Sequence, residues 1–418
     1  MNIDLTVYGN PQIGGVIEAP PSKSYTHRYL FLALLSLGET WIENPLKSGD
    51  TLATYNAVLK FGGEGDLNRI FSGGEPREPK DIIDCRRSGT TLRISLGVAA
   101  LVDGETVLDG DTQLRRRPIK PLIKALRNLG VEVILSNNIL PAKVRGGKLD
   151  RDYVTISSSK SSQFISSLLY LSMKTGIAIE VVDQPVSKGY IDMTISCLRE
   201  AGVKIYRDGY KFYRAEPTDP VGSRYRVPGD YSSAAYLMVL GVLGGGVVVK
   251  GLKSDDPHPD RSIIDILRLA GADVKIFGDR VELYSGKLEP IHVNIRDSPD
   301  LLPPLSILAA FINGKSVIEG IRHTKYKESD RPTTIKHNLR AMDIEAYIDN
   351  DKIIIYGGKP KPGIFNSYGD HRIAIAFAIA GLLLKGRSIV KNFHVYRDSY
   401  PTFLQDIKSL GGRVELKC

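Results

Sequence analysis

Hydroxyl and cationic side chains gather where an apolar helix is expected to begin. The segment "PSKSYTHR" contains such a group: Ser22, Lys23, Ser24 and, one helical turn later, Arg28. The first N–H groups of a helix lack acceptors within the helix and its dipole is positive there, so this end attracts anions. With Lys23 and Arg28 added, it is a candidate phosphate or carboxylate site. The alternative is an ordinary N-cap at Ser22 with solvated cations.

Other segments of the first half have the same character. In "SGTTLR", Gly89 lets the backbone approach a ligand closely, and the N–H groups of Gly89 and Thr90 are candidate anion donors. A capped helix alone would also explain this segment. Further candidates are Arg117 at the end of the triplet in "RRRPI", Ser161, Ser162 and Gln163 in "SSQF", and Ser187 and Tyr190 in "SKGY".

The second half supplies carboxylates as well as cations. Asp300 in "SPDLLPPLSILAAF" lies at the N-terminus of an expected apolar helix, where an aspartate is usually a cap. Two further segments bring charged residues to helix starts: "KESDR" with Lys327, Glu328 and Arg331, and "GDHR" with Arg372. Each segment can be explained as surface or cap, but similar polar helix starts in both halves would form a strongly anion-attracting cleft if the halves pack symmetrically.

A repeated element must position these helix starts. An apolar-periodic helix, a turn and a short alternating strand recur, as in "KALRNLGVEVIL" and "DILRLAGADVKIF". The turn positions lie about 70 residues apart, at Gly62, Gly130, Gly202, Gly271, Asp343 and Gly411. The chain of 418 residues is too long for one core, so we expect two domains of three α/β units each.

Composition narrows the class of partner. The net charge of +9 suits anions, and the cations stand singly beside Gly, Ser and Thr, which favours small anions over nucleic acid. Cys85, Cys197 and Cys418 are far apart and have no metal-ligand spacing, so we expect neither a disulfide framework nor a metal site. No apolar run reaches membrane-spanning length and no secretory signal is recognisable, so we expect a cytoplasmic protein without a membrane partner.

Taken in order, these motifs resemble the 5-enolpyruvylshikimate-3-phosphate synthase family. The similarity runs through "PSKSYTHR", "SGTTLR", "RRRPI", "SSQF", "SKGYIDMT", "PGDYSSAAY", "SPDLLP", "KESDR", "GDHRIAIAFAIAGL" and "DSYPTF". It implies an α/β fold of two similar domains, each of three βαβαββ units in an inside-out barrel-like arrangement with a six-fold pseudo-repeat. For this chain the first domain would comprise residues 1–19 and 228–418 and the second residues 20–227, with the active site in the cleft between them.

The resemblance also implies a reaction: transfer of the enolpyruvyl group of phosphoenolpyruvate to the 5-hydroxyl of shikimate 3-phosphate, by addition and elimination through a tetrahedral intermediate. We expect a monomer that uses no cofactor or metal. By similarity, shikimate 3-phosphate would be held by Ser24, Arg28, Ser161, Ser162, Gln163, Ser187, Tyr190 and Lys327. Phosphoenolpyruvate would be held by Lys23, Gly89, Arg117, Arg331 and Arg372. Asp300 would be the general base, and Glu328 and Lys23 would move the proton at the methylene carbon.

The chain departs from the family pattern at three positions. Arg87 and His323 stand where family members usually have Asn, and Asp398 stands where they usually have Lys. A carboxylate at that place would repel phosphoenolpyruvate, so Arg397 or Arg87 is a candidate to compensate. Gly89 keeps the residue type that leaves room for glyphosate, which predicts inhibition competitive with phosphoenolpyruvate.

Three other hypotheses about the function stay open at this point. The related enolpyruvyl transferase that acts on UDP-N-acetylglucosamine shares the fold, but Cys85 is not in a matching loop context. A nucleic-acid or other anion binder would fit the charge, and the Asp398 departure would fit a fold that has lost its activity.

Overall fold

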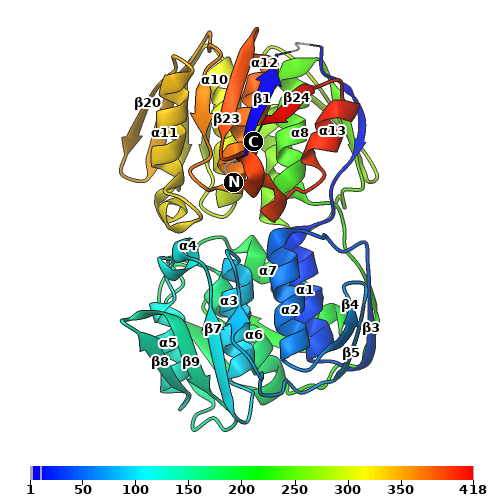
Figure 1. Ribbon diagram of the computed structural model, residues 1–418, viewed down its shortest axis with the longest axis vertical. Coiled ribbons are helices and arrows are strands. Elements are labelled where there is room, and N and C mark those ends of the chain that lie inside the picture. Colours follow the sequence, from blue (N-terminus) through cyan, green and yellow to red (C-terminus); the bar gives the residue numbers. More distant parts are fainter. Residues whose placement is uncertain (1–2, 10–11, 418) are drawn as a thin grey trace. The chain divides into compact units, whose positions relative to one another are not determined.

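The computed structural model describes residues 3–9 and 12–417. The chain divides into two compact units (Figure 1). Unit 1 comprises Met1–Pro20 and Pro228–Cys418, and unit 2 comprises Pro21–Val227. The described part of the chain contains no helix that is long and apolar enough to cross a membrane.

Unit 2 is a succession of short strands and helices. Its helices are α1 (Lys23–Leu34), α2 (Gly49–Lys60), α3 (Gly89–Ala99), α4 (Thr112–Arg115), α5 (Lys120–Asn128), α6 (Gln163–Thr175) and α7 (Gly189–Glu200). Its strands are β3 (Leu37–Glu43), β4 (Glu64–Asp66), β5 (Arg69–Gly73), β6 (Ile83–Asp84), β7 (Glu105–Asp109), β8 (Glu132–Ser136), β9 (Ile139–Arg145), β10 (Tyr153–Ile156), β11 (Ala178–Val181), β12 (Ile205–Asp208), β13 (Phe212–Ala215) and β14 (Arg224–Arg226).

Unit 1 has the same kind of order and adds 3₁₀ turns. Its helices are α8 (Tyr231–Gly244), α9 (Ile263–Leu269), α10 (Leu302–Phe311), α11 (Arg331–Ala341), α12 (His371–Leu383) and α13 (Phe403–Ser409). The 3₁₀ turns are Pro259–Ser262, Pro299–Leu301, Arg322–Tyr326 and Phe393–Asp398. Its strands are β1 (Asp4–Tyr8), β2 (Gly15–Glu18), β15 (Val247–Lys250), β16 (Asp273–Phe277), β17 (Arg280–Tyr284), β18 (His292–Asn294), β19 (Gly314–Glu319), β20 (Glu345–Asp349), β21 (Lys352–Gly357), β22 (Ile364–Asn366), β23 (Arg387–Lys391) and β24 (Arg413–Lys417).

One supersecondary arrangement is repeated in both units. In the described residues the strands form six four-stranded sheets, each with a parallel pair at one edge followed by antiparallel pairs. The sheet β10-β11-β13-β12, with α6 and α7 between its strands, is a complete βαβαββ unit. Strand β1 (blue) lies between β23 and β24, so the N-terminal strand completes the C-terminal sheet (Figure 1). The predicted α/β fold with its six-fold repeat is confirmed.

The turns of the repeat have the backbone conformation that their residue types predict. Gly62, Gly130, Gly202, Gly271 and Gly411 have φ between 84° and 100°, and Asp343 has φ 63°. Each follows the last helix of its repeat and leads into a strand. A glycine reaches this left-handed region without a Cβ penalty, and aspartate is among the few other residues that tolerate it. The turn positions expected from the sequence are confirmed.

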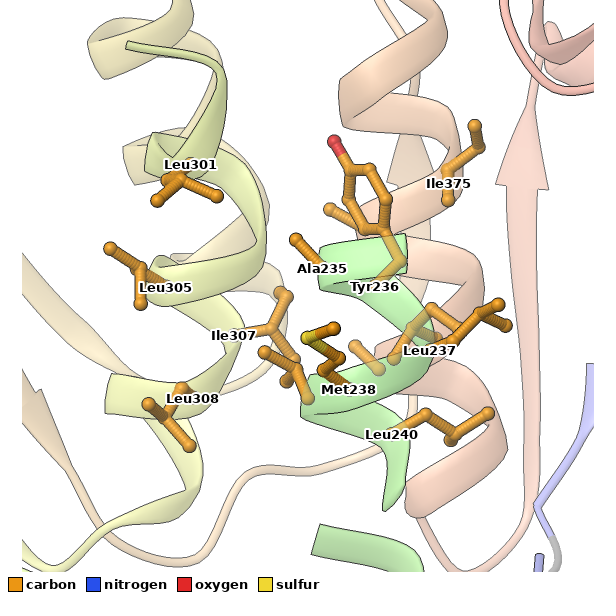
Figure 2. Close-up of a cluster of buried hydrophobic side chains, with 14 of the residues drawn as sticks. Ala235, Tyr236, Leu237, Met238, Leu240, Leu301, Leu305, Ile307, Leu308 and Ile375 are labelled. Carbon is orange, nitrogen blue, oxygen red and sulfur yellow. The ribbon is translucent and has the colours of Figure 1, made fainter. Parts of the chain in front are cut away.

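The first helix of each repeat is buried on nearly all sides. In unit 1, α8, α10 and α12 pack against one another through apolar side chains such as Met238, Ile307 and Ile375 (Figure 2). Burial of one such side chain contributes about 1.5–3 kcal/mol. In unit 2, α1, α3 and α6 are buried in the same way. A helix fixed on all sides cannot tilt or slide, so the polar residues at its start are held in place.

Candidate active site: two polar edges

We call the helix starts of α1, α3, α6 and α7 the unit 2 edge. At the start of α1, Ser22 is the N-cap and its Oγ accepts a hydrogen bond from Tyr25 N. Lys23 is not a solvated cation, because its Nζ lies 2.9 Å from Asp50 Oδ2 and its side chain is only 14% exposed. Asp50 lies in the first turn of α2, between the two residues of a capping box, Ser48 and Thr51. The capping box marks a helix start in the sequence, but no local signal there indicates that Asp50 contacts Lys23, 27 residues away.

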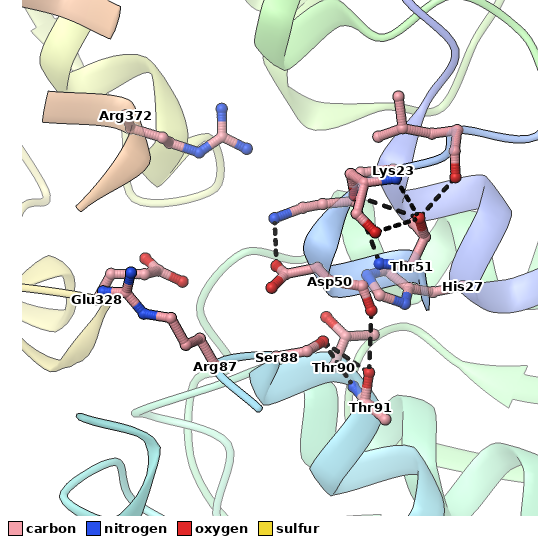
Figure 3. A network of polar contacts seen from close by, with 12 residues as sticks. Lys23, His27, Asp50, Thr51, Arg87, Ser88, Thr90, Thr91, Glu328 and Arg372 are labelled. Atoms are coloured by element: carbon pink, nitrogen blue, oxygen red, sulfur yellow. Dashed lines mark hydrogen bonds and ion pairs between the residues drawn. The ribbon is translucent and has the colours of Figure 1, made fainter. Parts of the chain in front are cut away.

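A buried hydrogen-bond network lies next to this ion pair, and Figure 3 shows the part of it that joins Asp50, Thr91 and Ser88. His27 Nδ1 lies 2.7 Å from Thr54 Oγ1, which lies 2.6 Å from Thr91 Oγ1. Thr91 Oγ1 in turn donates to the Ser88 Oγ at 2.7 Å. Burial holds the pKa of His27 well below its usual value, and the charge of Lys23 is the next largest cause. The imidazole of His27 is therefore neutral. The network joins the starts of α1, α2 and α3 without adding charge.

Arg28 joins the start of α1 to α7. Its Nη1 donates to Ser24 O at 2.9 Å, its Nη2 donates to Tyr190 O at 2.7 Å, and its Nε donates to Thr194 Oγ1 at 3.0 Å. The guanidinium is buried. The structure therefore brings the predicted residues Ser24, Arg28 and Tyr190 together.

Gly89 provides space for the guanidinium of Arg117. A Cβ at this position would lie 2.8 Å from Arg117 Cζ and Nη1 and 2.9 Å from Arg93 Nη1, closer than real Cβ contacts. Arg93 Nη1 donates to Gln163 Oε1, and Gln163 Nε2 donates to Thr90 Oγ1 at 2.9 Å. Arg93 thus orients the predicted residue Gln163, a role that its position in the sequence did not indicate.

The arginine triplet is not a uniform basic patch. Arg115 donates to both oxygens of Asp109, at 3.0 and 2.5 Å, so it is used in a structural ion pair. Arg116 is exposed, whereas Arg117 is buried and its Nη1 lies 3.5 Å from Arg87 O. Of the triplet, only Arg117 belongs to the polar edge.

The starts of α6 and α7 complete the unit 2 edge. Helix α6 begins at Gln163, so Ser161 and Ser162 lie just before it, and Gln163 N donates to Ser161 Oγ at 3.3 Å. Ser187 is buried and has φ 58°, an uncommon conformation for a residue other than glycine. Its carbonyl accepts a hydrogen bond from Tyr190 N at 3.1 Å. Such strain is found preferentially at functional sites.

We call the cluster around Asp300 the unit 1 edge. Asp300 does not cap α10, because it lies in a 3₁₀ turn and its carboxylate is bound by cations. Its Oδ1 lies 2.5 Å from Arg331 Nη1 and 3.5 Å from Lys327 Nζ, and its Oδ2 lies 2.9 Å from Arg372 Nη2. Burial raises the pKa of Asp300, but the cations, above all Arg372, outweigh this effect and hold the pKa well below its usual value. The usual interpretation of such an aspartate as a cap is therefore wrong here.

Arg331 is buried among carboxylates. In addition to its contact with Asp300, the Arg331 guanidinium contacts two more carboxylates. Its Nη2 lies 2.6 Å from Glu328 Oε2 and its Nε lies 2.9 Å from Asp370 Oδ2. Burial opposes the charge, but the carboxylates, above all Asp370, raise the pKa of Arg331 further above its usual value. Asp370 is also the N-cap of α12, since its Oδ1 accepts from Arg372 N at 2.9 Å. The sequence signals the cap in "GDHR" but gives no sign of the contact with Arg331.

Two residues that depart from the family pattern, Arg87 and His323, have different surroundings, and so does Arg397, the candidate to compensate for Asp398. Arg87 Nε lies 3.3 Å from Asp111 Oδ2, and Arg87 O accepts from the predicted residue Arg117. Burial lowers the pKa of His323 to about 3, with a smaller contribution from the charge of Lys327. Arg397 is exposed, with its guanidinium 5.6 Å from the centre of the Tyr396 ring.

The cysteines are not placed for chemistry. Cys85 and Cys197 are buried free thiols, and burial raises the pKa of Cys85 above its usual value. Cys418 lies outside the described residues. Across residues 3–9 and 12–417, no group of three or more His, Cys, Asp or Glu is arranged to hold a metal ion.

The predicted site residues divide between the two edges. The unit 1 edge contains Asp300, Lys327, Glu328, Arg331 and Arg372, which are linked by ion pairs. The unit 2 edge contains Lys23, Ser24, Arg28, Gly89, Arg117, Ser161, Ser162, Gln163, Ser187 and Tyr190. The cations of both edges, and the hydroxyls and helix N-termini of the unit 2 edge, suit ligands that carry phosphate and carboxylate groups.

Comparison with known proteins finds that the chain is similar to members of one family. The family model "EPSP synthase (3-phosphoshikimate 1-carboxyvinyltransferase)" matches residues 7–407. The 3-phosphoshikimate 1-carboxyvinyltransferase of Aeropyrum pernix is 43% identical over 417 residues, covering 99% of this chain and 97% of that protein. The protein of the same name from Pyrococcus abyssi is 41% identical and covers 98% of both chains.

Two solved structures are also similar to this chain. EPSP synthase from Acinetobacter baumannii has a TM-score of 0.83 and 25% identity, with both chains covered completely. The enolpyruvyl transferase NikO from Streptomyces tendae has a TM-score of 0.79, covering 100% of this chain and 99% of that one. At 17% identity, this second likeness shows the fold alone.

Proposed function

The chain belongs to the EPSP synthase family, and from this premise we propose how its two edges carry out the family's reaction. The enzyme transfers the enolpyruvyl group of phosphoenolpyruvate to the 5-hydroxyl of shikimate 3-phosphate and releases phosphate. This is a step of the shikimate pathway toward chorismate and the aromatic amino acids. The reaction is an addition followed by an elimination through a tetrahedral intermediate. The observation that carries the assignment of roles is the set of cations around the Asp300 carboxylate.

Both substrates are multiply charged anions, so their mutual repulsion must be offset before they can react. Arg117, Arg331, Arg372, Lys23 and the backbone at Gly89 bind phosphoenolpyruvate. Ser24, Arg28, Ser161, Ser162, Gln163, Ser187, Tyr190 and Lys327 bind shikimate 3-phosphate. Guanidinium groups suit this task, because their planar fork matches phosphate and carboxylate oxygens. The support is that most of these groups are at least partly buried, where charge interactions are less screened by salt.

Asp300 acts as the general base on the 5-hydroxyl. The cations around Asp300 hold its pKa well below the usual value, which makes it a weak base. The same cations that lower this pKa are proposed to bind the substrates. When phosphate and carboxylate groups engage Lys327, Arg331 and Arg372, their hold on Asp300 weakens and its basicity rises. The base is thereby activated by substrate binding.

Glu328 and Lys23 move the proton at the methylene carbon of phosphoenolpyruvate. Each is held by a neighbour of opposite charge, Glu328 by Arg331 and Lys23 by Asp50. Because Lys23 belongs to unit 2 and Glu328 to unit 1, we place the active site in a cleft between residues 20–227 and residues 1–19 with 228–418. Closure of the two domains on the substrates brings these groups into reach and excludes water.

The enolpyruvyl transferase that acts on UDP-N-acetylglucosamine is the less favoured alternative. That enzyme depends on a reactive loop cysteine, whereas Cys85 is buried and its pKa is raised, which keeps it as an unreactive thiol. The monomeric state, the cytoplasmic location and the absence of a nucleic-acid partner remain predictions from the sequence.

The deciding assay measures phosphate release from phosphoenolpyruvate with shikimate 3-phosphate or UDP-N-acetylglucosamine offered separately. We expect release only with shikimate 3-phosphate, and a loss of about 100-fold or more in kcat in Asp300→Asn because the base is removed. Asp343→Asn is the matched control, since Asp343 lies in an exposed ion pair with Lys361. Release with the UDP-sugar alone, or full activity of the Asp300 variant, contradicts the proposal.

A further inference from the structure

A cavity outside the residues assigned to the substrates lies on unit 2. It has a volume of about 350 Å³ and lies between α5 and the β10–β11 pair. Its lining residues are Lys120, Pro121, Lys124, Thr155, Ile156, Ser157, Lys160 and Val182. The volume is at the lower end of the usual range for small-molecule sites. The proposed reaction uses none of these residues.

The lining is strongly cationic. Lys120 and Lys124 come from one face of α5, one turn apart, and Lys160 comes from the segment before α6. The lining contains no aspartate or glutamate. Within the described ranges 3–9 and 12–417, neither Lys120 nor Lys124 has a carboxylate partner. Like charges one helical turn apart destabilise a helix, so an anion bound in the cavity would supply a counter-charge that Lys120 and Lys124 lack.

The remaining lining defines the shape of that anion. Pro121, Ile156 and Val182 add apolar surface, and Val182 is 63% exposed. Thr155 adds a hydroxyl that can donate to carboxylate or phosphate oxygens, whereas the Ser157 hydroxyl already donates to Asp183. The lining therefore suits a compact organic polyanion or a condensed phosphate better than a single monovalent ion.

A chain of hydrogen bonds connects the cavity wall to the unit 2 edge. Ser157, which lines the cavity, donates through Oγ to Asp183. Asp183 Oδ1 also accepts from Ser158 N at 2.9 Å, and Ser158 Oγ donates to Ser161 O at 2.9 Å. Ser161 is a proposed ligand of shikimate 3-phosphate, and the cavity residue Lys160 directly precedes it. Asp183 therefore holds the segment that carries both the cavity wall and the substrate ligand.

We propose that this cavity is an effector site for a small anion with two or more negative charges, and that its occupancy weakens the binding of shikimate 3-phosphate through Asp183. An anion that engages Lys160 draws the segment 157–162 toward the cavity and so displaces Ser161. The coupling is reciprocal, so shikimate 3-phosphate weakens the effector by the same factor. The proposal goes beyond the proposed function and uses it only for the choice of substrate in the test.

The first experiment measures binding of citrate and of inorganic pyrophosphate to the full chain by calorimetry at constant ionic strength. The two probes separate carboxylate from phosphate chemistry. In Lys120→Ala/Lys124→Ala we expect at least one probe to bind about tenfold more weakly than in wild type, because charge-assisted contacts are lost. Lys385→Ala/Lys408→Ala, which removes two exposed lysines of unit 1, is the control of equal charge and should not differ from wild type. Equal affinity in both double variants overturns the site, since any binding is then elsewhere.

The second experiment measures the dissociation constant of shikimate 3-phosphate with and without the bound probe. We expect the probe to raise it by about fivefold in wild type. The effect should vanish in Lys120→Ala/Lys124→Ala, which separates it from direct competition at the substrate site. In Asp183→Asn the probe should still bind but no longer change the substrate affinity. A probe that binds through the lysines and leaves the substrate affinity of the wild type unchanged overturns the effector role, while normal turnover without the probe leaves the proposed function intact.

Discussion

The guanidinium of Arg331 is held in place by Asp370, whose Oδ2 lies 2.9 Å from Arg331 Nε while both side chains are buried. The same carboxylate caps α12, so Arg331 is fixed to a helix that is packed on all sides. We infer that Asp370 sets the direction in which the remaining guanidinium nitrogens point.

Asp370→Asn should lower kcat/KM for phosphoenolpyruvate by about 100-fold, because a displacement of about 1 Å at a substrate-positioning group has an effect of this size. The KM for shikimate 3-phosphate should change much less. Steady-state kinetics with each substrate varied in turn would measure this, and Asp343→Asn serves as the exposed control. Equal losses for both substrates, together with a lowered melting temperature, would show that Asp370 matters only for folding.

Gly89→Ala should disturb the phosphoenolpyruvate site through Arg117. The new Cβ would lie 2.8 Å from Arg117 Cζ, so the guanidinium must move. We expect the KM for phosphoenolpyruvate to rise about tenfold, which corresponds to about 1.4 kcal/mol. Inhibition by glyphosate, which we expect to be competitive with phosphoenolpyruvate in wild type, should weaken. Gly73→Ala is the matched control, since nothing lies within 4 Å of a Cβ there. Unchanged glyphosate inhibition in Gly89→Ala would refute the assignment of this site.

Arg87, rather than Arg397, should supply the cation that the Asp398 departure calls for. Arg87 O accepts from the proposed ligand Arg117, so the residue borders the phosphoenolpyruvate site, whereas Arg397 is exposed against Tyr396. Arg87→Ala should raise the KM for phosphoenolpyruvate about tenfold, by loss of a charge-assisted contact, and Arg397→Ala should leave it unchanged. The reverse pattern in the two KM values would assign the compensation to Arg397.

His323 should make the protein less stable as the pH falls. Its pKa is lowered to about 3 in the folded state, whereas an unfolded histidine titrates near pH 6.5. The unfolded state therefore binds the proton first, so stability is lost as the pH falls from about 6.5 toward 3, by at most ~1.4 kcal/mol per pH unit. His323→Asn should lack this contribution.

Urea unfolding at pH 7, 6, 5 and 4 measures the effect as the difference between wild type and His323→Asn. His292→Asn is the control, because the His292 side chain is 68% exposed. The same pH dependence in wild type and His323→Asn would show that His323 titrates normally.

Much of the fold follows from local rules that the sequence displays. The glycine at position 130 and its counterparts end helices because they reach the left-handed region without strain, and apolar periodicity marks the helices they end. The starts of α1 and α3 could also be predicted from a local rule, since Ser22 and Ser88 are the N-caps of the helices that follow them. The family resemblance then assigned substrate roles to the residues near these starts.

The ion pairs within each edge could not be predicted in this way. A local pattern treats Asp300 as a cap, yet its carboxylate is bound by Arg331, 31 residues away. Likewise Lys23 pairs with Asp50 across 27 residues, and Arg93 orients Gln163 across 70. Caps and turns depend on the backbone within a few residues, so the amino-acid order by itself determined them. Which charges neutralise one another depends on which helix starts lie side by side, and only the packing of the apolar helices behind those starts decides that.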